Sequence, residues 1–302
     1  MIGTILGLLS AALFGISMVI IRRGVLKISP NYIAMISIFT GPPFLLLISS
    51  ITGDITELSC LGWKDYIFLA LSGITHFAIG RTWAYKSIQI IGSNRSNIVI
   101  TLTPLISVIL AIILLKETTT PLIFFGIIIS LSGPLLIVLK EQEKENNQFK
   151  DISRHTLYTG MIYGLGAATF WGSSNVFVKL GLGNSGSPIA GSLIAYTAAS
   201  FAISPSLFID GENKREILNK DKKLLKLAIL IGIATCMAHL LRYLALGYGS
   251  VIVISLMLRT QSIWILLFSF IFNRKYESFS IWVILANALV IIGTILILIP
   301  SG

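Results

Sequence analysis

Long apolar segments separated by short polar ones cover the whole chain. Each apolar segment is about 20 residues long, the length at which an α-helix crosses a hydrocarbon layer about 30 Å thick. The ten segments are 2–21, 31–50, 65–86, 93–115, 121–140, 157–179, 188–209, 224–246, 250–272 and 280–300. Because little sequence lies between them, the pattern predicts an all-α polytopic membrane protein with ten transmembrane helices.

Helix-breaking residues lie inside several of these segments. Proline lacks a backbone N–H and its ring clashes with the preceding turn, so it kinks or ends a helix. We predict interruptions at Gly41-Pro42-Pro43, Pro104, Gly133-Pro134 and Pro205. The carbonyl groups that such breaks free must find partners inside the helix bundle or line a cavity.

The chain contains an internal repeat. The stretch AALFGISMVIIRRG at 11–24 returns as ATFWGSSNVFVKLG at 168–181. We therefore divide the chain into a five-helix repeat at 1–140, a charged linker at 141–156 and a second five-helix repeat at 157–302. Since five is odd, the second repeat starts on the opposite side of the bilayer, so the two repeats are predicted to be inverted. Inverted repeats are typical of secondary transporters, in which two similar states open one central site to either side.

Composition agrees with a membrane protein and argues against a nucleic-acid partner. Hydrophobic residues make up 55% of the chain and charged residues 12%, and the mean hydropathy is +0.87. The net charge is +10, but the basic residues are spread over loops and helix ends, as expected of anchors at the membrane surface. Cys60 and Cys236 are far apart and lack metal-ligand spacing, so we expect neither a disulfide framework nor a metal or other cofactor.

The ionisable residues inside the predicted helices are basic. All 13 acidic residues fall in loops or at helix ends. A proton-coupled exporter of cationic drugs generally needs a carboxylate inside the membrane, so we disfavour that function. The basic and polar residues inside the helices are His76, Arg81, Asn175, His239, Arg242, Arg259 and Gln261.

Arg259 is the leading candidate for contact with a solute, together with Gln261. An arginine at mid-bilayer costs about 2.5–3.5 kcal/mol on insertion scales, and each neighbouring Leu or Ile offsets about 0.3–0.6 kcal/mol of that cost. The side chain is tolerable, but it is expected to point into the bundle rather than towards lipid. Its partner there would be a backbone carbonyl, water in a cavity, or an anionic group on a bound solute.

A second cluster of hydrogen-bond donors is predicted on the eighth helix. His239 and Arg242 are three positions apart and share one helix face, and His76 lies inside the third helix. Each has a structural alternative. The two histidines could be packing residues, and Arg81 and Arg242 could extend along the helix to the membrane surface.

The chain resembles the EamA-type branch of the drug/metabolite transporter superfamily. The resemblance rests on ALFGIS at 12–17, TFWGSSNVFVK at 169–179 and AYKSIQIIGSNRSNIVITLTPLISVILAIILLKE at 84–117. It implies a cavity lined by the first, third, fourth, sixth, eighth and ninth helices, whose wall would include Ser17, Trp83, Thr103, Trp171, Asn175 and Arg259. Gln261 stands where the family has a proline, and Arg274 falls opposite Glu117, so a relative's substrate does not carry over to this chain.

We therefore predict an alternating-access transporter of a small anionic or zwitterionic metabolite, such as an amino acid or organic acid, that works as a monomer in the cell membrane. A cationic drug or amine exporter and a non-transporting structural or sensory membrane protein are the alternatives. An intramembrane enzyme would need a carboxylate cluster, a histidine box or a nucleophile with a partner base, and the sequence shows none of these. The expected partners are the solute and the lipid bilayer.

The charge pattern also bears on orientation. Most Lys and Arg residues fall in loops on the side opposite the termini. The positive-inside rule therefore places both termini outside, whereas the relatives that the chain resembles mostly have cytoplasmic termini. We favour the orientation given by the charge count and keep the other as the alternative.

Overall fold

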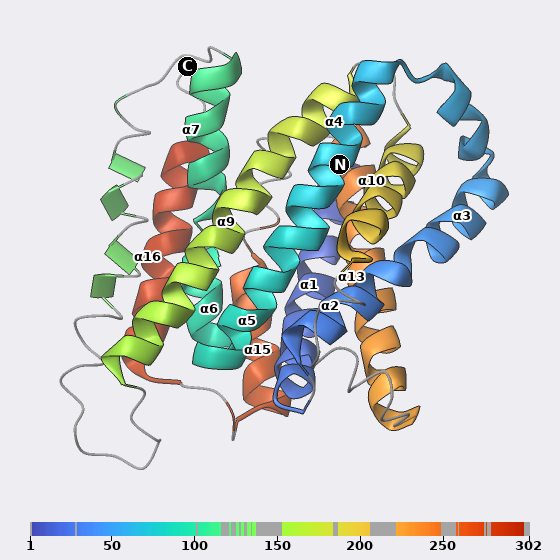
Figure 1. Ribbon diagram of the computed structural model, residues 1–302. Coiled ribbons are helices and arrows are strands. Elements are labelled where there is room, and N and C mark those ends of the chain that lie inside the picture. The colour runs from blue at the N-terminus through green and yellow to red at the C-terminus, as the bar shows by residue number, and fades with distance from the viewer. Residues whose placement is uncertain are drawn as a thin grey trace.

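The structure is a computed structural model in which the described residues form only helices and their connections (Figure 1). The described residues are 2–27, 29–100, 102–115, 121, 125–126, 128–129, 132–133, 135–136, 153–183, 187–205, 222–248, 258, 260–274, 276 and 279–298. No strand occurs among them, as the apolar pattern predicts for a chain that crosses a membrane.

The first half of the chain contains long helices broken into shorter pieces. Its elements are α1 (Ile2–Val25), α2 (Pro30–Phe39), α3 (Gly41–Thr52), a 3₁₀ segment η1 (Asp54–Cys60), α4 (Trp63–Gly73), a π-helical segment η2 (Ile74–Gly80), α5 (Arg81–Ile91), α6 (Ser93–Ile100) and α7 (Thr103–Leu115). The elements α4, η2 and α5 follow one another without a gap and together replace the third predicted helix.

The second half contains the longest helices. Its elements are α9 (Arg154–Leu182), α10 (Pro188–Ile203), α13 (Lys222–Tyr248), α15 (Gln261–Phe272) and α16 (Ile281–Leu298). Ser153 is the N-cap of α9, because its side chain accepts a hydrogen bond from the backbone N–H of Thr156 in the first turn. Figure 1 shows α7 and α16 at one edge of the bundle and α3 at the opposite edge.

Three of the predicted interruptions lie where helices begin or end. Thr40 separates α2 from α3, directly before Gly41-Pro42-Pro43. The helix α7 begins beside Pro104, and α10 ends two residues before Pro205. The fourth interruption cannot be located because Pro134 lies outside the described residues. Each of the three breaks agrees with the loss of a backbone donor at proline.

Among the described residues, three helices are both long and apolar enough to cross a membrane. They are Ile2–Val25, Lys222–Ala245 and the interrupted pair Pro30–Thr52, while Pro188–Ile203, Gln261–Phe272 and Ile281–Gly293 are shorter apolar helices. The predicted helix at 121–140 falls mostly outside the described residues. The total of ten transmembrane helices therefore stays a prediction, and the all-helical fold class is confirmed.

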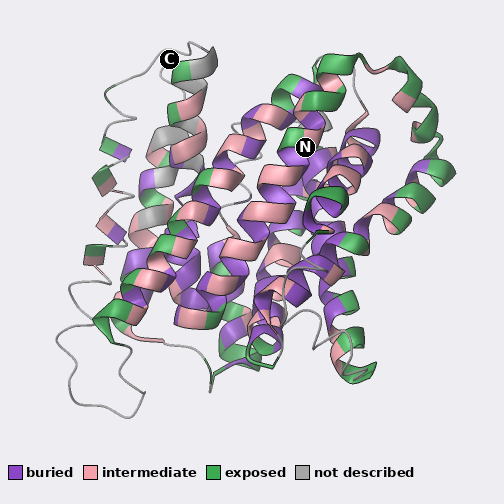
Figure 2. Cartoon of the chain, viewed as in Figure 1, coloured by how far each residue is buried: buried purple, intermediate pink, exposed green. Residues whose placement is uncertain are grey.

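Large apolar side chains cover much of the outer surface. Ile51 and Phe201 are 76% and 75% exposed, and many Leu and Ile residues are exposed on other helices. Figure 2 shows exposed and intermediate residues around the rim of the bundle and buried residues along its centre. A surface of this kind is expected to face lipid hydrocarbon rather than water, which supports an integral, multi-pass membrane protein.

The first helix of each half packs against helices of the other half. Helix α1 contacts α13 and α15, and α9 contacts α4, η2, α5 and α7. Gly15 of α1 lies against Trp264 of α15, and its repeat equivalent, Gly172 of α9, lies against Ile106 and the carbonyl of Thr103 on α7. A side chain at either glycine would prevent this close approach, which explains why the repeat places glycine at both positions.

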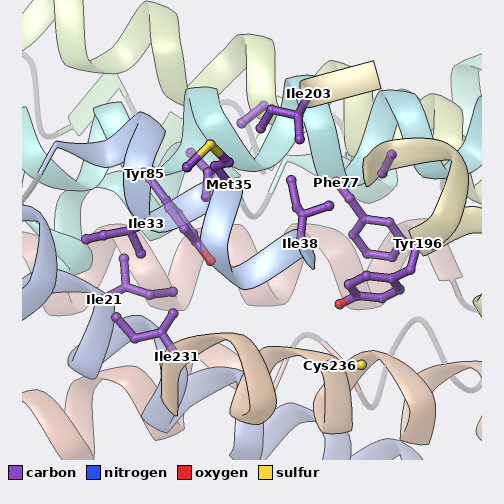
Figure 3. Packing of buried hydrophobic residues seen from close by; sticks show 14 of the residues in the cluster. Ile21, Ile33, Met35, Ile38, Phe77, Tyr85, Tyr196, Ile203, Ile231 and Cys236 are labelled. Carbon is purple, nitrogen blue, oxygen red and sulfur yellow. The ribbon is translucent and has the colours of Figure 1, made fainter. Parts of the chain in front are cut away.

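One hydrophobic cluster joins the two halves at the centre. The rings of Phe77 and Tyr196 stack with their centroids 4.0 Å apart, and Figure 3 shows this pair beside Ile38, with Cys236 close by. Cys236 is buried and Cys60 is exposed, and both are free thiols. The tight packing of this cluster gives the polar residues beside it a rigid surrounding.

Candidate functional site

A π-helical turn places His76 at the centre of the bundle. In η2 the backbone hydrogen bonds span one residue more than in an α-helix, as in the bond from the N–H of Arg81 to the carbonyl of His76. The indole Nε1–H of Trp171 donates to the carbonyl oxygen of His76 over 2.9 Å. Gly80, at the end of η2, has no side chain, which lets the Trp171 ring lie against the backbone there. The hydrogen bond and the ring contact of Trp171 therefore join η2 to α9.

The ring of His76 contacts Ser174 of α9. Its Nδ1 lies 2.7 Å from the hydroxyl oxygen of Ser174, and that hydroxyl also lies 2.9 Å from the carbonyl oxygen of Trp171. The serine hydroxyl can act towards Nδ1 as donor or as acceptor, so this contact fits both tautomers of a neutral imidazole. The His76 ring also stacks on Trp171 with 5.1 Å between centroids and 13° between planes.

His239 of α13 meets His76 from the other half of the chain. The two imidazole rings lie edge to face with centroids 4.8 Å apart and planes at 88°. Phe14 and Phe77 contact the His239 ring at centroid distances of 4.7 and 4.8 Å. The Nδ1 atom of His239 is buried without a hydrogen-bond partner among the described residues. His239 therefore combines an aromatic surrounding with an available ring nitrogen.

Arg81 is a buried cation held by neutral groups. Its Nη1 donates to the hydroxyl of Ser37 over 3.1 Å and its Nη2 donates to the hydroxyl of Tyr196 over 2.8 Å. Its guanidinium carbon also lies 4.9 Å from the ring centroid of Phe77 and 5.3 Å from that of Tyr196. Arg81 is 2% exposed and Arg242 is 5% exposed, so the alternative that these two side chains extend to the membrane surface is wrong.

Arg242 is buried but only partly hydrogen-bonded. Its Nη1 donates to Oδ1 of Asn175 over 2.9 Å. The Nδ2 of Asn175 donates to the hydroxyl of Ser107 over 3.1 Å, and Ser107 in turn donates to the carbonyl of Gly172 over 3.1 Å. The other two guanidinium nitrogens, Nε and Nη2, are buried without a hydrogen-bond partner in the described part of the chain. These two atoms form the side edge of the guanidinium plane, which can bind a carboxylate or phosphate through two parallel hydrogen bonds.

The surroundings of this site are electropositive. We call His76, Arg81, His239 and Arg242 the basic cluster; all four are buried. The acidic residues that the structure describes, Asp54, Glu57 and Asp65, lie in η1 and in the first turn of α4 instead. Among the described residues, therefore, the positive charge of the basic cluster has no carboxylate to balance it.

The structure brings together five of the ten predicted site residues, namely His76, Trp171, Asn175, His239 and Arg242. Ser17 and Thr103 are also buried. The hydroxyl of Ser17 donates to the carbonyl of Leu13 in its own helix, and that of Thr103 donates to the carbonyl of Ile100 at the end of α6. Trp83 packs edge-on against Tyr163 and Phe170 instead.

The remaining two candidates are Gln261 and Arg259, of which the structure describes Gln261. Gln261 is the first residue of α15 and is partly buried. Arg259 lies outside the described residues, so its direction is still the one predicted from the sequence. Neither residue can be placed in or out of the basic cluster from its contacts.

Sequence reasoning left several residues of the site out of the candidate set. Arg81 was recognised as lying inside a helix but not as part of the site, and Ser107, Ser174 and Tyr196 were not singled out. The repeat held a signal for Arg81. The spacing of Arg81 to Tyr85 returns as His239 to Tyr243, so Arg81 is the repeat equivalent of His239. The hydroxyl residues carry no such signal because Ser and Tyr are common in apolar helices.

The described residues contain no group of three or more His, Cys, Asp or Glu side chains that could hold a metal ion. The basic cluster places hydrogen-bond donors beside aromatic rings in buried surroundings. In surroundings of low dielectric constant, the attraction between opposite charges is stronger than in water.

Comparison with known proteins agrees with the two-part organisation. Residues 1–139 and 158–299 match the EamA-like transporter family. No match was found among curated protein sequences. A solved crystal structure, described only as that of a protein, is similar to 97% of this chain and 95% of its own chain, with a TM-score of 0.64 and 15% identity. That likeness shows a shared fold. Because the family match covers both halves, the chain belongs to the EamA-like transporter family, whose members are membrane transporters rather than enzymes.

Proposed function

We propose that this protein is a secondary transporter that moves a small anionic or zwitterionic metabolite, such as an amino acid or organic acid, by alternating access. Membership of the EamA-like family supports transport, and the basic cluster supports the charge of the solute. We further propose that one chain forms the complete pathway and that it works in the plasma membrane.

The open edge of Arg242 is the observation that carries this proposal. A buried guanidinium with two unpartnered nitrogens is costly in an apolar surrounding. A carboxylate or phosphate group that docks side-on would accept from both nitrogens and balance the charge. Binding of an anionic solute therefore removes the cost of the two unpartnered nitrogens, and for this reason the site prefers anions.

Neighbouring groups supply the rest of a binding site. The unpartnered Nδ1 of His239 can accept a hydrogen bond from a second polar group of the solute, or donate one to it. The rings of Trp171 and Phe14 lie beside the two histidines and offer apolar surface to the solute body. A cationic drug would bring another positive charge to a cluster that already holds two guanidiniums, so this site disfavours it.

Arg259 and Gln261 keep the role proposed from the sequence. Both lie in the predicted helix at 250–272, which the family resemblance assigns to the cavity wall. An Arg259→Ala variant is expected to lose affinity for the solute. Unchanged transport by that variant would remove Arg259 from the site without affecting the argument from Arg242.

A thermal-shift screen of the purified protein tests the proposal. The panel is glycine, L-alanine, L-glutamate, succinate, inorganic phosphate and tetramethylammonium. Binding to the folded state raises apparent stability by RT ln(1 + [L]/Kd), which is about 2.7 kcal/mol at a concentration of 100 Kd. We expect at least one anionic or zwitterionic compound to stabilise the protein and tetramethylammonium to have no effect.

Variants show whether the effect arises at Arg242. Arg242→Lys keeps the charge but removes the two-nitrogen edge, so it should weaken stabilisation by the same compound. The matched control is Arg274→Lys, because Arg274 is exposed and should leave the response unchanged. Stabilisation by tetramethylammonium alone, or no response to any anionic or zwitterionic compound of the panel, would refute the proposed substrate class.

A further inference from the structure

We infer that Asn175 determines the charge of the solute: its neutral amide holds Arg242 in position without neutralising it. This inference rests on the proposed function and assigns Asn175 the part of a positioning residue rather than a solute contact. The position could have carried a carboxylate of nearly the same shape. Asparagine there leaves the positive charge to be balanced by the solute.

The hydrogen bonds around Asn175 allow only one orientation of its amide. The guanidinium of Arg242 can only donate, so the atom facing it at 2.9 Å must be the acceptor Oδ1. On the other side, the hydroxyl oxygen of Ser107 accepts from Nδ2 at 3.1 Å. The Ser107 proton is committed to backbone carbonyls, those of Gly172 at 3.1 Å and Thr103 at 3.2 Å. Two hydrogen bonds, Asn175 to Ser107 and Arg242 to Asn175, therefore connect α7 through α9 to α13.

These hydrogen bonds fix which edge of Arg242 remains available. Because Nη1 is hydrogen-bonded to Asn175, an incoming group cannot bind Nη1 and Nη2 as a pair. The side edge formed by Nε and Nη2 has no hydrogen-bond partner among the described residues. Asn175 thus selects the side-on geometry for the incoming group. It also stays uncharged, so it does not compete with that group for the guanidinium.

An aspartate at this position would keep the shape of the side chain and add a negative charge. Asp has the same side-chain shape as Asn, and the proton of Ser107 can turn towards its second oxygen. The resulting pair of Asp and Arg242 would be a charge-assisted hydrogen bond inside the bundle. Arg242 would then already have its counter-ion, and a solute anion would be repelled by the new carboxylate.

The test compares Asn175→Asp with Asn175→Leu, which has a similar size and no charge. For each purified variant we would titrate the panel compound that best stabilises the native protein, from glycine, L-alanine, L-glutamate, succinate and inorganic phosphate, and record the melting temperature without ligand. We expect Asn175→Asp to bind about 100-fold more weakly and to melt at a higher temperature without ligand. Asn175→Leu should bind about tenfold more weakly, because Arg242 loses its anchor but keeps its charge.

The outcomes separate this inference from the proposed function. If the native protein is stabilised and Asn175→Asp binds equally well, the inference is wrong and the function stands. An Asn175→Asp variant that fails to fold, or that melts below the native protein, also contradicts the inference. The reason is that the new carboxylate is expected to stabilise the buried charge of Arg242 and so raise the melting temperature. If no compound stabilises the native protein, both the function and the inference fall. A merely structural Asn175 would make the leucine variant the weaker binder of the two.

Discussion

Arg81 donates a hydrogen bond of 2.8 Å to the hydroxyl of Tyr196, and this contact joins the two halves of the chain inside the bundle. Arg242, also buried, has two guanidinium nitrogens without a partner among the described residues. The two arginines therefore differ in how fully the protein itself satisfies them. In the proposed function, Arg81 is a structural residue and Arg242 binds the solute.

Arg81→Met is expected to lower the melting temperature. The change removes hydrogen bonds to Ser37 and Tyr196 and leaves the Tyr196 hydroxyl without its donor, which costs about 1–3 kcal/mol. Differential scanning fluorimetry of the ligand-free protein measures the effect. A variant as stable as the native protein would show that Arg81 does not hold the halves together.

Arg242→Met is expected to have the opposite effect on the ligand-free protein. Removal of a partly unsatisfied buried charge relieves a cost, so the melting temperature should stay equal or rise. Stabilisation by the anionic or zwitterionic compound should disappear. Arg274→Met, at an exposed position, is the control for loss of an arginine. Loss of folding in Arg242→Met would argue for a structural role instead.

Gly73→Ala should destabilise the contact between α4 and α10. A Cβ atom on Gly73 would overlap the backbone carbonyl of Ala195, and a backbone atom in a packed helix cannot move aside as a side-chain end can. Overpacking of this kind costs about 1–3 kcal/mol. Gly62→Ala is the control, since its nearest neighbour is the flexible carboxylate of Asp65 at 3.3 Å. Equal melting temperatures for the two variants would contradict this packing argument.

Asn273→Leu should separate the ends of α1 and α15. Asn273 is fully buried; its Nδ2 donates to the carbonyl of Val19 over 2.7 Å, and its Oδ1 accepts from Nε of Arg23 over 2.6 Å. Loss of both bonds in a buried place is expected to cost about 1–3 kcal/mol. Limited proteolysis and thermal melting would report the loosening, with the exposed Ser59→Ala as control. Unchanged values in both assays would show that this junction is not needed for stability.

The local elements follow directly from the sequence. A run of about 20 apolar residues in lipid must satisfy its own backbone, which only a helix does within one segment. Proline removes a donor, so the breaks at Thr40, before Pro104 and before Pro205 were predictable. The π-helical turn at Ile74–Gly80 was not, because no proline or other local signal marks it. In this turn the carbonyl of His76 accepts from the backbone N–H of Arg81 and also from the indole of Trp171 on another helix, a contact that no local pattern shows.

The candidate site was predictable in part. Sequence reasoning found His76, Asn175, His239 and Arg242 because polar residues inside apolar helices are rare and costly. It did not distinguish Arg81 from Arg242, since the two have the same chemistry and similar surroundings in sequence. The difference between them arises from their partners on other helices, which are Tyr196 for Arg81 and Asn175 for Arg242.

The sequence by itself determined the membrane-spanning class of the protein, its helices and its twofold repeat, because these depend on the length and composition of single segments. Tertiary structure alone decided which faces meet: α1 against α13, α9 against α5, and the basic cluster between them. The physical reason is that lipid hydrocarbon and a packed protein interior are almost equally apolar. A helix face that meets lipid and one that meets protein therefore look alike in sequence, and only the close fit of small residues and paired polar groups tells them apart.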